Sequence, residues 1–415
     1  MPKNIRNKHR NIITALDIGF SKVACIISEY DSNLEALKVI GVGQHGSKGI
    51  KKGLVTNMEA LENSILNAVH KAEKNTGLTV KNIFASISGT HLLSERVDVS
   101  INISGSSVSE YDINRLINQG TSISMESDYD VIHAAPINFT LDHTKNIRDP
   151  RGMYGKLLTG HMHIITGSRS VVRNLVTCLH RCHLSIQGLI PSAYASGLAT
   201  LVEDEMDLGV TVIDFGGGST DIGIFKDGDL IHAECIPVGS YHITNDLSKG
   251  LGSSIKEAER IKTLYGSAIT TNEDDKIMID IPQIGDHNTE VTFQTKRSRI
   301  TSIIQPRVEE IFELIYKRLS ETNTINLTGR RIVITGGGSQ LPGFRELSAN
   351  ILNKQVRLGK PLRIYGLGDI TNSPAFSTCT GLLTFALRQN YAAITNQNSQ
   401  HNIFAKVSSW FKEYF

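Results

Sequence analysis

Residues 210–225 read Val-Thr-Val-Ile-Asp-Phe-Gly-Gly-Gly-Ser-Thr-Asp-Ile-Gly-Ile-Phe. β-Branched residues precede the glycines and an apolar run follows them, which predicts a strand, a tight turn and a returning strand. Because Gly216, Gly217 and Gly218 have no Cβ, their N–H groups can converge on an anion, and Ser219 and Thr220 add hydroxyl donors. Asp214 would repel a phosphate unless a cation lay between them, so its expected partner is hydrated Mg²⁺. The stretch therefore predicts a metal–nucleotide phosphate site, with a ligand-free glycine hairpin as the simpler alternative.

A second copy of this pattern lies near the start of the chain. Residues 11–30 contain an apolar strand, the turn Asp17-Ile-Gly19-Phe-Ser21-Lys22 and a second apolar strand. Each copy has an Asp that ends the first strand, a Gly two residues later and a hydroxyl soon after. We call residues 17–22 hairpin 1 and residues 214–220 hairpin 2. Two such hairpins predict two similar lobes that face one ligand.

A third glycine segment, Arg331-Ile-Val-Ile-Thr-Gly336-Gly337-Gly338-Ser339, predicts a flat surface for a base or ribose. The capping-box pattern at residues 254–257 begins a helix that carries Glu259 and Lys262 three residues apart on one face. These side chains either reach the ribose or adenine or form a surface ion pair. Gly239 is also assigned to the nucleotide site.

Composition limits the class of protein. The 415 residues suffice for two or three domains, and 43 Lys and Arg against 41 Asp and Glu leave a net charge of +2, which argues against a nucleic-acid partner. No apolar segment follows the basic start, so we expect no secretory signal and a cytoplasmic chain with reduced cysteines. Two Cys and two His within residues 178–183 permit a zinc site, but the helical apolar pattern favours Cys as small core residues. Residues 184–202 lack charge, yet their Pro, Gly and Ser content favours a buried strand and helix over a membrane span.

The expected fold class is α/β, with two duplicated lobes, a small β-rich inserted subdomain in the first lobe and a C-terminal amphipathic helix. Strict alternation in residues 96–103 predicts a half-exposed antiparallel strand outside the central sheet. We divide the chain into the first lobe (1–85 and 164–206), the inserted subdomain (86–163), the second lobe (207–266 and 331–390), its outer part (267–330), a flexible tether (391–402) and the terminal helix (403–415).

The last residues predict a membrane-binding helix. At 100° per residue one arc collects the aromatic and aliphatic side chains, namely Ile403, Phe404, Val407, Trp410, Phe411, Tyr414 and Phe415. A terminal helix often docks on its own domain. Here the polar tether and the aromatic content favour a lipid interface, with Lys406 and Lys412 near anionic headgroups.

Together, the paired Asp-x-Gly hairpins, the Ile-Thr-Gly-Gly-Gly segment, the insertion and the tethered terminal helix resemble the bacterial cell-division FtsA family of the actin-like ATPase superfamily. The resemblance implies bound ATP and Mg²⁺, the ion held through water by Asp17 and Asp214. It also implies a filament of like subunits that tethers the tail of the tubulin-like protein FtsZ to the cytoplasmic face of the inner membrane at the division site. Later division proteins would bind the inserted subdomain, and Arg299 and Arg307 are candidates for receiving the acidic tail.

One departure from related sequences bears on catalysis. Actin-like chaperones and MreB-type filaments have Glu-Pro-x-Ala-Ala where this chain reads Ile190-Pro-Ser-Ala-Tyr194. The acid that would orient the attacking water is absent, so we expect at most a slow ATPase in a mainly structural protein. Two alternatives share the hairpins or the lobes: an exopolyphosphatase-type phosphohydrolase and a PilM-like pilus-assembly adaptor.

Overall fold

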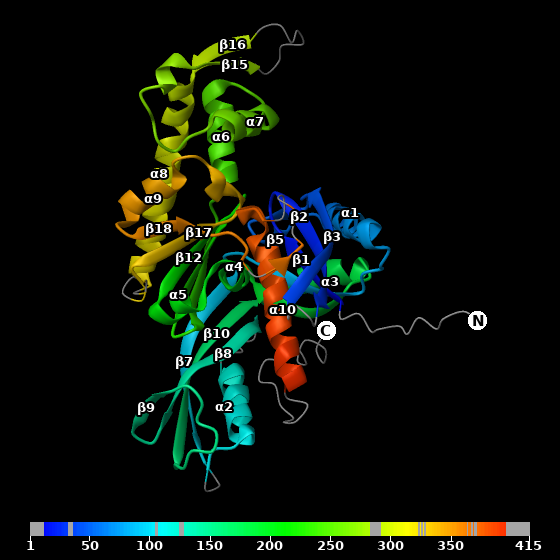
Figure 1. The fold of residues 1–415 in the computed structure, drawn as a ribbon, viewed down its shortest axis with the longest axis vertical. Helices are drawn as coiled ribbons and strands as arrows, with labels where there is room; N and C mark the ends of the chain where they lie inside the picture. The colour runs from blue at the N-terminus through cyan, green and yellow to red at the C-terminus, as the bar shows by residue number, and fades with distance from the viewer. Residues whose placement is uncertain are drawn as a thin grey trace, which may run out of the picture.

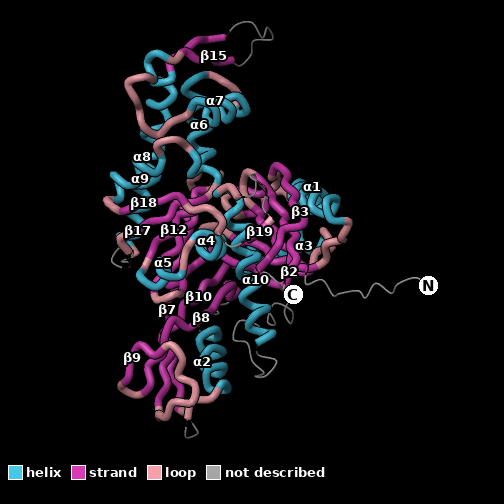
Figure 2. Tube along the Cα trace, in the orientation of Figure 1, coloured by secondary structure: helices cyan, strands magenta, loops and turns pink. Residues whose placement is uncertain are grey.

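The computed structural model describes residues 12–31, 36–103, 107–123, 128–282, 292–322, 324, 327, 329–362, 364–366, 368 and 372–395. Two lobes, each built on a central sheet, form the middle of an elongated molecule (Figure 1). The inserted sheet lies at one end of the long axis and a small helical part with a two-stranded sheet lies at the other. Helices flank both central sheets (Figure 2).

The sheet of the first lobe has the strand order β11-β6-β1-β2-β3-β19. Its strands are β1 (Ile12–Ile18), β2 (Lys22–Asp31), β3 (Ala36–Gly46), β6 (Asn82–Ile87), β11 (Ser185–Pro191) and β19 (Ile364–Tyr365). Strands β1, β2 and β3 are antiparallel, and β6 runs parallel to both β1 and β11. A short hairpin, β4 (Ile50–Lys51) and β5 (Leu54–Val55), precedes α1.

Helices cover both faces of this sheet. Helices α1 (Met58–Thr76) and α3 (Arg169–Arg181) pack on one face, and α4 (Ser192–Thr200) and α10 (Ser377–Thr395) pack on the other. Asn57 caps α1 by accepting a hydrogen bond from the Ala60 N–H at 2.9 Å, and Gly77 ends it in the left-handed conformation. The uncharged stretch 184–202 forms β11 and α4, as predicted, and the thiols of Cys178 and Cys182 are buried in the core.

The second lobe repeats this arrangement. Its sheet has the order β14-β13-β12-β17-β18, with β12 (Val210–Phe215), β13 (Thr220–Lys226), β14 (Asp229–Ile236), β17 (Arg331–Thr335) and β18 (Gln355–Leu358). Helices α5 (Glu203–Leu208) and α9 (Phe344–Leu352) belong to this lobe. As in the first lobe, an antiparallel hairpin lies beside a parallel strand, because β12 pairs antiparallel with β13 and parallel with β17. The predicted duplication of lobes is confirmed.

The inserted sheet is antiparallel, with the order β7-β10-β8-β9. It consists of β7 (Leu92–Asn102), β8 (Tyr129–Leu141), β9 (Thr144–Ile147) and β10 (Leu157–Ser168), and α2 (Glu110–Ile123) covers one face. The predicted alternation along β7 is confirmed, since Val99 and Ile101 are buried while Arg96, Asp98 and Ser100 are exposed.

The outer part of the second lobe lies at the opposite end of the molecule (Figure 1). There α6 (Ser240–Leu251) and α7 (Ile255–Tyr265) lie near the hairpin of β15 (Met278–Pro282) and β16 (Thr292–Lys296). Helix α8 (Arg297–Glu321) runs from this hairpin back toward the central sheet, with Pro306 inside it. Its buried face joins the hydrophobic core of the lobe.

Near its end the described chain returns to the first lobe. Strand β19 pairs with β3, and α10 packs against α4 and β1. The sequence-based division, which assigned residues 331–390 as a whole to the second lobe, missed this crossing because it depends on long-range packing. The predicted membrane helix, residues 403–415, lies outside the described residues.

Candidate functional site

Hairpins 1 and 2 meet between the lobes. Each turn is closed by a backbone hydrogen bond, from the Gly19 N–H to the Lys22 carbonyl and from the Gly216 N–H to the Ser219 carbonyl, both at 3.0 Å. A Cβ at Gly217 would lie 1.9 Å from Ser21 Oγ, so a side chain there would collide with hairpin 1. The glycines therefore let two turns from different lobes approach closely, which is what a shared phosphate site requires.

A cavity of about 520 Å³ opens between the hairpins. Residues 336–338 form its third glycine wall, where a short 3-10 helix (Gly337–Gln340) follows β17. Gly336 adopts φ 89°, and a Cβ there would lie 2.4 Å from a carboxylate oxygen of Asp214. Most of the predicted nucleotide-site residues line this one cavity: Asp17, Gly19, Ser21, Lys22, Asp214, Gly216, Gly217, Gly218, Ser219, Glu259, Lys262, Gly336, Gly337 and Gly338.

Three predicted residues do not line the cavity, contrary to expectation. The Thr220 hydroxyl donates to the Val238 carbonyl at 2.7 Å, and the Ser339 hydroxyl donates to the Gly336 carbonyl at 2.7 Å. Gly239 supports hairpin 2 from behind, because a Cβ there would meet the carbonyl oxygens of Gly216 and Gly217. These three residues support the walls of the site, and the hydroxyl groups of Thr220 and Ser339 are hydrogen-bonded to backbone carbonyls of the protein itself.

The polar end of the cavity contains a buried cation. The Lys22 ammonium has no hydrogen-bond partner and lies 3.4 Å from the centroid of the Phe376 ring. Burial lowers the pKa of Lys22, and the nearby Asp17 opposes that effect. A buried ammonium that contacts an aromatic ring and has no hydrogen-bond partner leaves its donors free for an anionic ligand.

Buried carboxylates stand beside this lysine. Burial raises the pKa of Asp17, and burial followed by the neighbouring Asp221 raises the pKa of Asp214 to about 7. Burial also raises the pKa of Asp221 to about 6, against a hydrogen bond from the Ser88 hydroxyl. Ionising these groups together is costly unless a cation compensates them.

The carboxylate oxygens are the donor type that Mg²⁺ prefers. Within the described part of the chain, no three His, Cys, Asp or Glu side chains are grouped closely enough to hold a metal ion. The donor set therefore fits a hydrated Mg²⁺ that also contacts phosphate, and it does not fit a protein-only metal cage. The same finding gives no support to zinc binding in residues 178–183.

Sequence reasoning missed several polar residues of the site. Asp221 lines the cavity and stands opposite Asp214 in the β12–β13 register. Hydroxyl groups hold the three carboxylates: Ser86 donates to Asp17 at 2.8 Å, Thr378 to Asp214 at 2.8 Å and Ser88 to Asp221 at 2.7 Å. Asp221 directly follows hairpin 2 in the sequence and was detectable, whereas the hydroxyls come from distant segments and carry no local signal.

Glu259 and Lys262 form the ion pair that their spacing allows, and their contact with a ribose or adenine stays a prediction. The ion pair is 2.8 Å long, and both side chains line the cavity. Thr244 joins the pair by donating to Glu259 and accepting from Lys262 at 2.8 Å. The helix start is as predicted, since Ser254 caps α7 by accepting from the Glu257 N–H.

The strand that would supply a water-orienting acid supplies none here. Ile190 is 2% exposed and packs in the apolar core of the first lobe. The next polar residue, Ser192, lines the cavity, and its hydroxyl donates to the Ile87 carbonyl at 3.3 Å.

The two arginines predicted to bind a partner lie in different environments. Arg299 lines a surface cavity of about 780 Å³ together with Phe293 and Lys296. Arg307 is instead paired with Asp246 at 2.5 Å and with Glu310. Arg299 is therefore the better placed of the two to receive an acidic peptide.

Over the described residues, no helix is both long and apolar enough to cross a membrane.

Comparisons with known proteins agree with this architecture. A family model described as cell division protein FtsA matches residues 211–381, and one described as an SHS2 domain inserted in FtsA matches residues 89–166. The cell division protein FtsA of Agrobacterium fabrum is 37% identical, covering 100% of this chain and 97% of that protein. FtsA of Escherichia coli K12 is 28% identical, and the match covers 98% of this chain and 97% of that protein.

Solved structures support the fold alone. The PilM–PilN type IV pilus biogenesis complex has a TM-score of 0.64 at 15% identity, covering 90% of this chain and 98% of that one. MreB5 of Spiroplasma citri bound to AMPPNP has a TM-score of 0.54 at 14% identity, and the match covers 95% of this chain and 100% of that one. These likenesses confirm the actin-like architecture, while the curated relatives do not favour the phosphohydrolase or pilus-adaptor alternatives. Sequence identity along nearly the whole chain and matches to both family models show that this chain belongs to the FtsA family of bacterial cell-division proteins.

Proposed function

We propose that this chain binds ATP with Mg²⁺ between its lobes and, as a filament, anchors the FtsZ tail to the cytoplasmic membrane at the division site. One observation carries the nucleotide part of the proposal. Three glycine segments from two lobes surround a cavity in which a buried ammonium without a hydrogen-bond partner stands beside buried carboxylates.

The phosphates are assigned to the hairpin end of this cavity. The backbone N–H groups of Gly217 and Gly218, together with Ser21, Ser219 and Lys22, would bind them, and the ion would neutralise Asp17 and Asp214 through its water molecules. The base and ribose would lie at the other end, beside Glu259, Lys262 and the third glycine segment. A structural neighbour, MreB5, is recorded with AMPPNP, which supports a nucleotide in this fold.

Hydrolysis is expected to be slow. With Ile190 in the core and no acid from that strand in the cavity, the attacking water lacks its orienting group. The bound ATP would therefore act mainly to hold the lobes together. Turnover of purified protein at the roughly 1–100 s⁻¹ typical of kinases would contradict this part of the proposal.

Membrane attachment is assigned to residues 403–415. Burial in lipid of each large apolar side chain on this arc contributes about 1.5–3 kcal/mol toward attachment. Sedimentation with anionic liposomes, with and without ATP, tests the assignment. Trp410→Glu should abolish pelleting and keep nucleotide binding, whereas Ser409→Glu, which adds the same charge to the polar face, should still pellet. Equal pelleting of both variants would exclude insertion of the aromatic face.

The FtsZ tail is assigned to the surface around Arg299. An acidic tail would gain from the charges of Arg299 and Lys296 and from contact with Phe293, which is 56% exposed. Arg299→Ala should weaken binding of the tail peptide at least about tenfold, in line with the roughly 1.5–3 kcal/mol of a charged hydrogen bond. Arg307→Ala should have a smaller effect because its guanidinium is already paired. Fluorescence anisotropy with the labelled peptide measures both variants, and equal losses would contradict the assignment.

Self-assembly into a filament and recruitment of later division proteins through the inserted subdomain complete the proposal. Negative-stain microscopy on lipid monolayers with ATP should show filaments. A labelled chain expressed in cells should gather at the division site, and uniform membrane labelling would contradict this localisation.

A further inference from the structure

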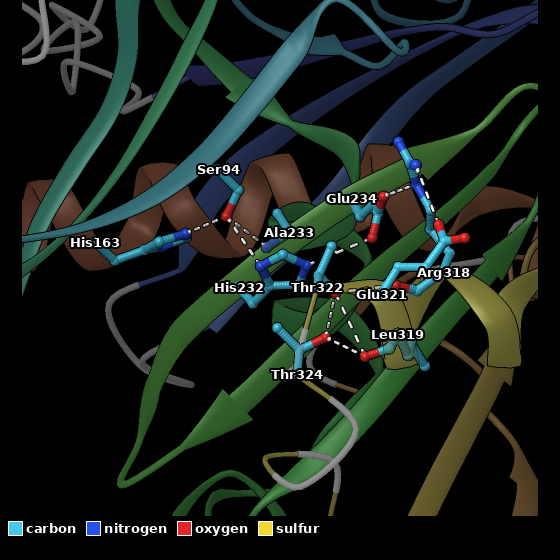
Figure 3. Close-up of polar contacts among 10 residues, drawn as sticks. All are labelled: Ser94, His163, His232, Ala233, Glu234, Arg318, Leu319, Glu321, Thr322 and Thr324. Atoms are coloured by element: carbon cyan, nitrogen blue, oxygen red, sulfur yellow. Dashed lines mark hydrogen bonds and ion pairs between the residues drawn. The ribbon is translucent and has the colours of Figure 1, made fainter.

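Ser94 is the polar junction between the inserted sheet and the second lobe (Figure 3). It lies on β7, and its hydroxyl accepts a hydrogen bond from the Ala233 N–H of β14 at 3.0 Å. The same oxygen lies 2.8 Å from His163 Nε2 on β10 and 3.4 Å from His232 Nδ1 on β14. On the next residue of β14, Glu234 accepts from Arg318 of α8. One hydroxyl thus joins two strands of the insert to the edge strand of the second lobe.

The segment that begins at Ser88 and ends at Ser94, which we call the linking segment, also touches the nucleotide cavity. The Ser88 hydroxyl donates to both carboxylate oxygens of Asp221, at 2.7 and 2.8 Å. Asp221 pairs in register with Cys235 on β14, and Ser88 Oγ is 3.7 Å from the Cys235 sulfur. The linking segment therefore contacts the second lobe twice, at a cavity carboxylate and at β14.

The backbone of the linking segment is constrained. Gly89 has φ 151°, and a Cβ there would lie 2.5 Å from the His91 ring. The His91 carbonyl accepts from the Ser168 N–H at the end of β10, so the pairing of β7 with β10 continues into the linking segment. The His91 ring is packed with neither nitrogen hydrogen-bonded. We therefore expect a backbone shift at Ser88 to move Ser94 by a similar amount.

Beyond Ser94 a gap lies between part of the insert and the second lobe, and Arg148 of the insert pairs with Asp207 of α5 at 3.4 Å. A cavity of about 900 Å³ lies between Arg96, Asp98 and His161 of the inserted sheet and Lys226 and Thr322 of the second lobe. Leu92 and Ile165 of the insert also pack in an apolar cluster with Leu230 of the second lobe, so the two parts are held near Ser94 by apolar as well as polar contacts.

We propose that the linking segment couples occupancy of the nucleotide cavity to the orientation of the inserted subdomain, with Ser94 as the positioning residue. The inference rests on the proposed nucleotide binding. Asp221 stands opposite Asp214, so a hydrated cation at Asp214 competes through its water molecules with the Ser88 hydroxyl for the oxygens of Asp221, and the occupied and ligand-free states differ in this contact. Release of Ser88 moves the linking segment, and Ser94 transmits that movement to β7 and β10.

Hydrogen exchange of the full-length chain tests the proposal, at a concentration where sedimentation shows no assembly. In the wild type, Mg²⁺ with AMPPNP should change exchange in peptides covering β7 and β10 by at least about fivefold, the lower range of allosteric coupling. Ser94→Ala should still bind AMPPNP, measured by calorimetry, and should lose this change. Ser94→Thr, which keeps the hydroxyl, should restore it. Ser100→Ala, on the same strand but bonded to Thr159, should behave as the wild type.

The outcomes separate the two proposals. If the wild type binds AMPPNP and Ser94→Ala keeps the full change in exchange, the coupling is refuted and nucleotide binding stands. If the wild type binds AMPPNP and the insert does not respond, the coupling is also refuted. If the wild type binds no nucleotide by calorimetry, the proposed function fails and the coupling fails with it.

Discussion

Replacing Asp214 with Asn should make the ligand-free protein more stable and remove its response to Mg²⁺ and ATP. Burial and the neighbouring Asp221 raise the pKa of Asp214 from 3.8 to about 7. Between these values the folded state binds more protons than the unfolded state, so stability falls as pH rises through this interval. An Asn carries no charge, and its side-chain oxygen can still accept the hydrogen bond from Thr378, which is 2.8 Å long in the native chain.

The magnitude follows from the pKa values. Each tenfold change in an acid dissociation constant is worth about 1.4 kcal/mol, so ionising Asp214 in the folded state costs roughly 4 kcal/mol at pH 8. Near pH 4 the folded carboxyl is protonated and the cost falls below about 1 kcal/mol. The stabilisation by Asp214→Asn should therefore be large at pH 8 and nearly absent at pH 4.

Urea unfolding of the ligand-free chain at both pH values measures this difference. With Mg²⁺ and ATP at about 100 times the dissociation constant, the native chain should gain about 2.7 kcal/mol at pH 8, and the variant should gain much less. Asp204→Asn is the matched control, because Asp204 is exposed on α5 and does not line the cavity. The reasoning is refuted if ligand-free Asp214→Asn is no more stable than the native chain at pH 8, or if it gains the full stabilisation from Mg²⁺ and ATP.

Two further substitutions test how the second lobe is built. Gly239→Ala places a Cβ 2.6 and 2.7 Å from carbonyl oxygens of hairpin 2. Because this displaces a binding loop, ATP affinity measured by calorimetry should fall at least about tenfold. Gly46→Ala is the control, since a Cβ at Gly46 meets nothing within 4 Å and should leave ATP affinity unchanged. Arg357→Ala leaves the buried carboxylate of Glu205 without its partner and should cost roughly 2–3 kcal/mol in urea unfolding, less than a fully buried pair because the Arg357 side chain is 38% exposed. Arg345→Ala, from an exposed pair, should cost below about 1 kcal/mol. Unchanged affinity in Gly239→Ala, or equal costs for the two arginines, would contradict the packing described.

Local sequence determined the two hairpins, the third glycine segment and the alternation along β7. Each of these is encoded within a few adjacent residues: glycines where the backbone must turn or approach another chain segment, β-branched residues in strands, and period-two burial. That is why Asp17, Lys22, Asp214 and the glycine walls could be assigned to one cavity from the sequence. Asp221 follows the same local pattern and could have been included.

Tertiary structure decided the remaining features. Ser86, Ser88 and Thr378 reach the three cavity carboxylates from 69, 133 and 164 residues away, and no local pattern identifies such partners. The isolation of the Lys22 ammonium, the return of α10 to the first lobe and the junction at Ser94 depend in the same way on which segments the packed lobes bring together. Local residue patterns specify backbone turns and periodic burial. The charge state of a buried group, its desolvation and its hydrogen-bond partners depend instead on neighbours in space, and those neighbours are in place only after the lobes have folded against each other.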